Sequence, residues 1–146
     1  MRSRLTLLLT VATFFSWVVV QAQCDADKDA ALCIKMENEG YHMVKSFKLD
    51  GESNPGTIEV SSVFAKNIDY SINTCESGQV SDQIVVTIYD SKRKKIASNN
   101  EDGNISPTLN FTCKNTGVYY VTYEHEKSRA YCGLSAVSFK RDESRN

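Results

Sequence analysis

From Val44 onward, clusters of Gly, Asn, Asp and Ser divide the chain into short segments rich in Val, Ile, Tyr, Thr and Phe. These residue types favour pleated strands, and the polar clusters favour turns. An apolar period of 3.6 residues appears only before residue 40, so a parallel α/β fold is not expected. The predicted strands cover residues 43–49, 57–64, 68–75, 83–90, 94–98, 108–113, 118–124 and 131–139.

Side-chain alternation assigns faces to these strands. In segment 57–64, Ile58, Val60 and Phe64 fall on one side, so this strand is expected to be half buried. Segment 83–90 is apolar on both sides and is therefore expected to lie in the interior of a sheet.

Two turns have a local explanation in the sequence. Asp90 and Ser91 can cap a reversal over residues 89–94, and the segment 115–117 ends in a glycine that tolerates positive φ. Both turns are expected to connect the strands of hairpins.

Eight short strands without β-α alternation predict a mainly β fold, an antiparallel two-sheet β-sandwich of jelly-roll-like type. A closed barrel is the alternative. Residues 25–40 begin with acidic residues, continue with apolar ones and end in Gly40, which predicts one short N-terminal helix. The predicted organisation is a signal peptide over 1–22, a helical segment over 23–42, a β-sandwich domain over 43–140 and a disordered tail over 141–146.

The first residues have the features of a secretory signal peptide. Arg2 and Arg4 precede an apolar run from Leu5 to Val20, and small residues follow at its end. We predict cleavage, a secreted or periplasmic protein and no membrane association afterwards. A retained N-terminal anchor, and hence a membrane-tethered structural protein, is the alternative because Leu5 to Ala22 is 18 residues, just long enough to span a bilayer.

All five cysteines follow the predicted signal peptide, and in an exported chain most cysteines form disulfides. The candidates are Cys24, Cys33, Cys75, Cys113 and Cys132. An odd count leaves one thiol free, and the sequence alone does not select the pairing. We favour Cys24 with Cys33 and Cys75 with Cys113, which leaves Cys132 free. No two cysteines have the spacing of a zinc site or of a thioredoxin-type redox motif.

The stretch from Ile84 to Phe139 carries an ordered set of strand and turn motifs. The strand end Ile88-Tyr89-Asp90 leads to Ile96-Ala97-Ser98, an acidic and Asn-rich loop, an apolar strand, the hairpin motif Gly117-Val118-Tyr119-Tyr120-Val121 and a closing strand. In this order the stretch resembles the bacterial pre-peptidase C-terminal (PPC) type of domain, a secreted β-sandwich module. The cysteines depart from the usual pattern of that family. The resemblance implies an accessory module in an exported protein.

Catalytic motifs are not found in the sequence. His42 and His125 lack the spacing of a metal site and are interpreted as surface or turn residues, and no G-x-S-x-G elbow is present. We therefore predict a protein that is not an enzyme and needs no cofactor. An enzyme that uses the unpaired cysteine as a nucleophile is the alternative.

Two polar segments have a binding interpretation and a structural one. The oxygen-rich loop residues Asn100, Glu101, Asp102 and Asn104 could ligate Ca²⁺, but a solvated connection is the preferred interpretation. The basic run 92–95 is interpreted as a charged hairpin tip that protects a sheet edge, with attraction to an anionic polymer or membrane surface as the alternative.

A possible ligand surface lies on strand 118–124. Tyr119 and Tyr123 share one face and Tyr120 lies on the other, so one face is expected to be core and the other to expose an aromatic surface suited to a sugar ring or a protein. Ordinary cross-strand packing is the preferred alternative.

These features together predict a function class. Because 17 basic residues nearly balance 18 acidic ones, nucleic acid is not expected as a partner. The sequence predicts an exported, non-enzymatic, disulfide-stabilised binding or accessory module with a protein or carbohydrate partner.

Overall fold

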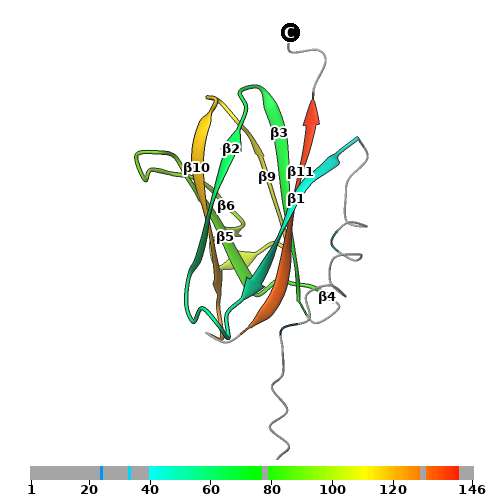
Figure 1. Ribbon diagram of the computed structural model, residues 1–146, viewed down its shortest axis with the longest axis vertical. Helices are drawn as coiled ribbons and strands as arrows, with labels where there is room; N and C mark the ends of the chain where they lie inside the picture. The colour runs from blue at the N-terminus through cyan, green and yellow to red at the C-terminus, as the bar shows by residue number, and fades with distance from the viewer. Residues whose placement is uncertain (1–23, 25–32, 34–39, 77–78, 129–130, 142–146) are drawn as a thin grey trace, which may run out of the picture.

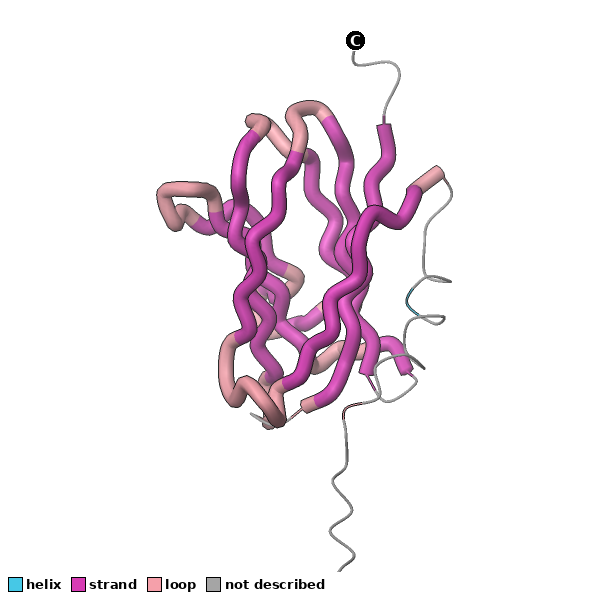
Figure 2. The backbone as a smooth tube through the Cα atoms, viewed as in Figure 1, coloured by secondary structure: helices cyan, strands magenta, loops and turns pink. Residues whose placement is uncertain are grey.

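The described part of the chain in this computed structural model is almost entirely strands and short connections (Figures 1 and 2). The structure describes residues 24, 33, 40–76, 79–128 and 131–141. The predicted signal peptide, nearly all of the predicted helix and residues 142–146 lie outside this part. Within it, no helix combines the length and apolar character needed to cross a membrane.

The strands pair antiparallel throughout. One sheet has the order β1-β11-β3-β4, with β9 also paired to β3; a second has the order β2-β10-β5-β6, and β7 and β8 form a small hairpin. The bounds are β1 (His42–Asp50), β2 (Ile58–Phe64), β3 (Ile68–Glu76), β4 (Gln79–Val80), β5 (Ile84–Tyr89), β6 (Lys95–Ser98), β7 (Asn100–Glu101), β8 (Asn104–Ile105), β9 (Thr108–Thr112), β10 (Gly117–His125) and β11 (Cys132–Arg141).

The two larger sheets lie in separate layers, and their facing side chains form one hydrophobic core (Figure 1). Ile72 of β3 and Val137 of β11 enter the core from the first sheet, and Val86 of β5 and Val121 of β10 enter from the second. Each fully buried aliphatic side chain stabilises the fold by about 1.5–3 kcal/mol relative to its exposed state. The core therefore couples the two sheets.

The predicted mainly β, antiparallel fold is confirmed. All eight predicted strands are present with ends that differ by at most two residues, and β5 lies between β10 and β6, in the interior of its sheet as predicted. In β2, Phe64 is buried, Ile58 and Val60 are half-buried, and the intervening positions are exposed, as the alternation predicts. The short strands β4, β7 and β8 were not predicted.

One of the two predicted hairpins is present. Asp90 closes the β5–β6 hairpin: its Oδ1 accepts hydrogen bonds from the backbone N–H groups of Lys92 and Lys94 at 2.8 and 2.9 Å. The prediction for segment 115–117 is wrong. Since β9 pairs with β3, and β10 pairs with β2 and β5, this segment connects two sheets, and Gly117 begins β10 without positive φ.

The favoured disulfide pairing is also wrong. Disulfides join Cys24 to Cys132 and Cys33 to Cys75, and Cys113 is the buried free thiol. The reason is the side of the sheet on which each sulfur lies. Cys113 belongs to the core between the sheets, whereas Cys75 lies in a second buried cluster with Cys33.

That second cluster covers the outer face of the first sheet. It contains Cys33, Cys75, and Leu134 and Ala136 of β11, with Cys24 packed against it. Both disulfides therefore attach the chain before β1 to the sheet formed by β3 and β11. Constraints of this kind stabilise a fold mainly by restricting the unfolded chain.

Candidate functional site

Two of the three tyrosines of the predicted ligand surface lie in the core. Tyr119 and Tyr123 are 7% and 0% exposed, so the prediction that they face a ligand is wrong and the packing alternative holds. The Tyr119 hydroxyl donates to the carbonyl of Asn115 at 2.7 Å, and the Tyr123 hydroxyl accepts from Ser135 Oγ at 2.9 Å. Burial raises the pKa of Tyr119 to about 12 and raises the pKa of Tyr123 as well.

Tyr120 lies on the opposite face of β10, but one side of its ring is already covered. The Arg93 guanidinium lies 3.8 Å from the ring centroid, and its two terminal nitrogens contact the Glu59 carboxylate. This hydrogen bonding raises the pKa of Arg93. The covered ring is a poor stacking surface for a sugar. Arg93 belongs to the β5–β6 tip, which is charged and exposed as predicted.

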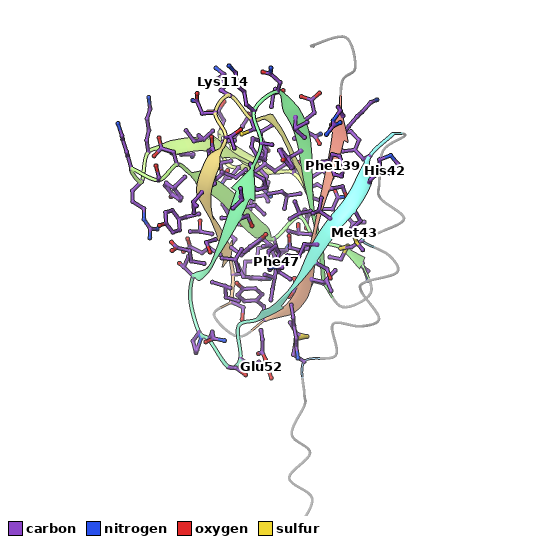
Figure 3. All side chains as sticks on the ribbon, turned by 45° about the horizontal axis from the view of Figure 1, so that its top comes forward. His42, Met43, Phe47, Glu52, Lys114 and Phe139 are labelled. Atoms are coloured by element: carbon purple, nitrogen blue, oxygen red, sulfur yellow. A yellow bond between two sulfur atoms is a disulfide. The ribbon has the colours of Figure 1, made fainter. Side chains whose placement is uncertain are left out.

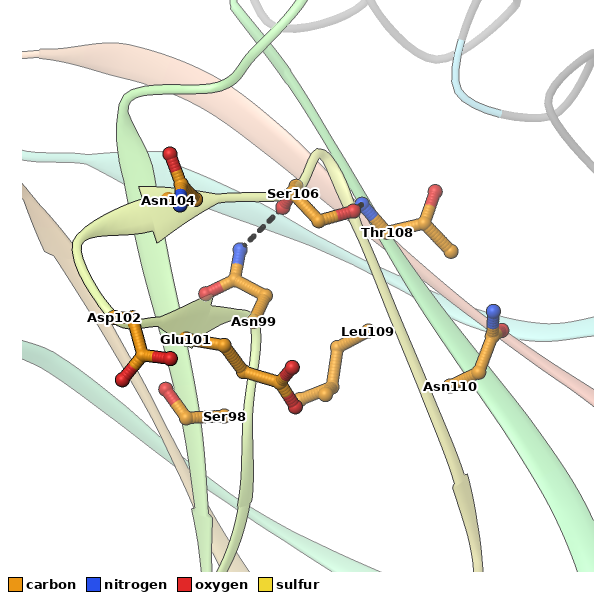
Figure 4. A pocket seen from close by; sticks show the side chains of 9 residues that line it. All are labelled: Ser98, Asn99, Glu101, Asp102, Asn104, Ser106, Thr108, Leu109 and Asn110. Carbon is orange, nitrogen blue, oxygen red and sulfur yellow. Dashed lines mark hydrogen bonds between the residues drawn. The ribbon is translucent and has the colours of Figure 1, made fainter.

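The loop predicted as a calcium alternative forms the β7–β8 hairpin beside a surface depression of about 460 Å³ (Figure 4). The buried Asn99 amide holds this hairpin. Its Oδ1 accepts from Val86 N at 2.7 Å, and its Nδ2 donates to the carbonyls of Ile84 and Ser106 at 2.9 and 2.6 Å. Asn99 orders the loop by these contacts and is not oriented as a metal ligand.

The four calcium-candidate residues lie around the tip of that hairpin. Glu101, Asp102 and Asn104 are exposed and Asn100 is half-buried, and Asp102 has a positive φ of 52°. Across the described residues, no three His, Cys, Asp or Glu side chains gather closely enough to hold a metal ion. The calcium site stays a prediction, and the exposed hairpin agrees with a solvated connection.

The two histidines differ from each other. His42 is exposed on β1. His125 is at the end of β10, but its side chain is only 8% exposed and its Nε2 lies 3.2 Å from Glu76 Oε2. Its Nδ1 accepts hydrogen bonds from the backbone N–H groups of Lys127 and Ser128, so the ring stabilises the turn after β10. The surface or turn interpretation agrees with both residues: His42 lies on the surface, and His125 is a half-buried turn residue paired with a carboxylate.

The free thiol of Cys113 is 2% exposed and faces the core. Its Sγ lies 3.1 Å from the carbonyl of Asn115 and 3.5 Å from the Tyr119 hydroxyl. His125 is engaged by Glu76 instead, so within the described residues the geometry does not assemble a Cys–His nucleophile.

An open groove lies at a place for which the sequence predicts no candidate site. Among the described residues, β1 and β2, the first strands of the two large sheets, each pair with only one strand, and a groove of about 460 Å³ opens beside them. We call it the β1–β2 groove. Its apolar lining includes Val44, Phe47, Val63, Phe64, Ile68 and Phe139.

The apolar residues around the β1–β2 groove are unusually accessible. Val63 is 72% exposed and Val44 is 59% exposed, while Phe47 and Phe139 are half-buried (Figure 3). Single exposed aliphatic residues are common on protein surfaces, but a contiguous apolar groove is typical of an interaction site. The groove therefore has the character of a binding surface.

The edges of the groove differ in their capacity to pair with another strand. β1 has an irregular register between Met43 and Lys45, and such bulges and charged residues protect an edge. β2 is regular over all seven residues of its pairing with β10. Alternate residues of β2 thus direct their backbone N–H and C=O groups away from β10, toward the open side.

A sequence signal for this groove exists at Val63. The positions that alternate with the core side chains of β2 are Glu59, Ser61 and Val63, so an aliphatic residue interrupts an otherwise polar face. This break in the alternation could have marked the groove. The contribution of Phe139 could not be anticipated, because it depends on the spatial position of β11 beside β1.

No family model and no curated protein sequence matches this chain. Among solved structures, the chain is similar to the crystal structure of PliG of Aeromonas hydrophila, a periplasmic inhibitor of g-type lysozyme. The alignment covers 71% of this chain and 91% of that chain with 15% identity and a TM-score of 0.49. A similarity at this level assigns neither fold nor function, and the PPC-type resemblance stays a prediction.

Proposed function

We propose that this protein is an exported, non-enzymatic binding module that captures an extended apolar segment of a partner protein in the β1–β2 groove. The observation that carries the proposal is Val63, an aliphatic side chain that is 72% exposed on a regular, free-edged strand at an apolar groove. A strand added to β2 would bond to its free backbone groups and bury alternate side chains in the groove.

The scaffold in this proposal is a jelly-roll sandwich. The order β1-β11-β3-β9 in one layer and β2-β10-β5-β6 in the other supports that connectivity. In such an arrangement the chain passes from one layer to the other between β1 and β2, so both sheets present an edge at the same side. A partner strand at this side would contact both sheets.

Export is supported by two features of the chain. Two disulfides are expected in an oxidising compartment and are rare in the cytosol. The basic residues and apolar run at the N-terminus are those of a signal peptide. We therefore place the binding activity in the periplasm or outside the cell.

A protein partner is favoured over a carbohydrate. Sugar binding usually needs an exposed aromatic ring beside hydrogen-bonding side chains, but Tyr119 and Tyr123 are buried and Arg93 covers Tyr120. The β1–β2 groove instead presents aliphatic and phenyl groups beside free backbone edges. These features fit an extended polypeptide.

The test is selection of an eight-residue peptide library on the purified oxidised protein, followed by affinity measurement on two variants. Val63→Ser removes an exposed aliphatic group at the groove, and Ile96→Ser removes a 44% exposed one from β6, at the opposite edge of the same sheet. Loss of the buried apolar area should weaken peptide binding about tenfold in Val63→Ser and leave Ile96→Ser unchanged.

A glycan array serves as the second arm of this experiment. Peptides that bind both variants equally would contradict the assignment of the groove. Glycan binding without any peptide binding would replace the protein partner with a carbohydrate.

A further inference from the structure

We infer that the captured segment carries two carboxylates in the pattern acidic-x-apolar-x-acidic, and that Lys45 and Arg141 recognise them at the two ends of the β1–β2 groove. This inference rests on the proposed function and specifies its partner chemically. Among the described residues that line the groove, Lys45 and Arg141 are the charged ones, and both are cations.

Neither cation makes an ion pair within the described part of the protein. Arg93 engages Glu59 and Lys48 approaches Asp50, so basic side chains elsewhere do have carboxylate neighbours. Lys45 instead lies with its Nζ 4.7 Å from the centroid of the Phe47 ring. An anionic ligand could therefore pair with both cations without first displacing an internal carboxylate.

The local charge is distinct from that of the whole chain. The protein has a formal net charge of −1, so a groove whose described lining residues include two cations and no carboxylate departs from the average surface. In the groove, the two cationic groups lie beside phenyl and aliphatic side chains. A complementary segment must combine negative charge with apolar side chains.

The strand register gives the spacing of the backbone positions that carry the two cations. Lys45 of β1 lies opposite Val137 of β11, and Val137, Phe139 and Arg141 alternate along one face of β11. Arg141 lies four positions beyond Val137 along the strand, which corresponds to about 13 Å between their Cα atoms. Phe139 lies between these ends, where the apolar residue of the captured segment would pack.

An extended peptide has the same periodicity. Its side chains i, i+2 and i+4 point to one face and span about 13 Å. When such a peptide pairs with β2, its inward face meets Lys45, Phe139 and Arg141 across the groove. This match of spacing favours a peptide over a fatty-acid anion, which has one headgroup and no backbone to bond to the edge of β2.

Three acetylated and amidated peptides test the inference by fluorescence anisotropy on the full oxidised protein. Their central sequences are Glu-Thr-Val-Thr-Glu, Gln-Thr-Val-Thr-Gln and Lys-Thr-Val-Thr-Lys. With up to a fivefold gain for each exposed ion pair, the Glu peptide should bind up to about 25-fold more tightly than the Gln peptide, and added salt should reduce this ratio.

Charge-reversal variants show which residues cause the preference for the Glu peptide. Lys45→Glu/Arg141→Glu should reverse the order so that the Lys peptide binds most tightly. The matched control, Lys92→Glu/Lys95→Glu, changes the net charge equally at the β5–β6 hairpin and should keep the wild-type order. A control that loses the preference as strongly would overturn the inference, since the effect would then be one of net charge.

The remaining outcomes separate the inference from the proposed function. Equal binding of the Glu and Gln peptides, sensitive to Val63→Ser, would overturn the inference and leave the proposed function in place. Binding of palmitate but of none of the peptides would overturn both.

Discussion

Replacement of both Cys33 and Cys75 by alanine is expected to lower the free energy of unfolding by about 4 kcal/mol. The two cysteines are 42 residues apart, and closure of a loop of that length restricts the unfolded chain by about 4 kcal/mol at 25 °C. Both side chains are fully buried, so the variant also loses packing. Because a small domain is stable by only about 5–15 kcal/mol, this loss is a large fraction of the total.

The assay is urea unfolding followed by far-UV circular dichroism on the oxidised proteins. Cys113→Ala is the matched control, because it removes a buried sulfur that forms no disulfide and should cost only about 1 kcal/mol. Under reducing conditions the difference between wild type and Cys33→Ala/Cys75→Ala should fall to the packing loss alone, about 1 kcal/mol for each buried sulfur. A loss in the oxidised variant no larger than that of the control, or a difference that stays near about 4 kcal/mol after reduction, would contradict the stabilising role of this disulfide.

Three other measurements test the packing and the electrostatics. Asn99→Ala removes three hydrogen bonds of a buried amide, so urea unfolding should show a loss of about 2–4 kcal/mol; a loss below about 1 kcal/mol would show that the β7–β8 hairpin does not depend on them. Gly133→Ala places a Cβ 2.6 Å from the backbone oxygen of Cys75 and should lower thermal stability by about 1–3 kcal/mol, whereas an unchanged melting temperature would contradict this contact. Burial raises the pKa of Tyr119 and of Tyr131 to about 12, so the stability linked to these protonated hydroxyls is complete below pH 10 and is lost as the pH rises from about 10 to 12. Absorbance at about 295 nm should show late tyrosine ionisation that coincides with unfolding, and ionisation of all tyrosines near pH 10 in the folded protein would contradict the shift.

The strands of this fold are encoded locally and could be predicted from the sequence. In β2, a period of two places Ile58, Val60 and Phe64 on the core side, and this pattern does not depend on the rest of the chain. The disulfides could not be predicted in this way. The partners are 42 and 108 residues apart in the sequence, so their pairing depends on the tertiary fold that brings them together.

The candidate site was predicted less completely than the fold. Alternation correctly separates Tyr119 and Tyr123 from Tyr120, but aromatic residues on both faces of β10 leave open which face is the core. The structure places the first two inside, and β10 pairs on both of its sides, so it offers no free edge. The β1–β2 groove depends on contacts among β1, β2 and β11. In the sequence, only Val63, an aliphatic residue on the otherwise polar face of β2, indicates it.

The proposed function requires a partner segment to pair with the free edge of β2. Hydrogen exchange with and without the Glu-Thr-Val-Thr-Glu peptide measures this pairing, because paired backbone amides exchange slowly. Such pairing predicts added protection in Ile58–Phe64, in the amides that point away from β10, and unchanged exchange in Lys95–Ser98 at the opposite edge. Protection confined to Lys95–Ser98, or unchanged exchange in Ile58–Phe64 at saturating peptide, would contradict it.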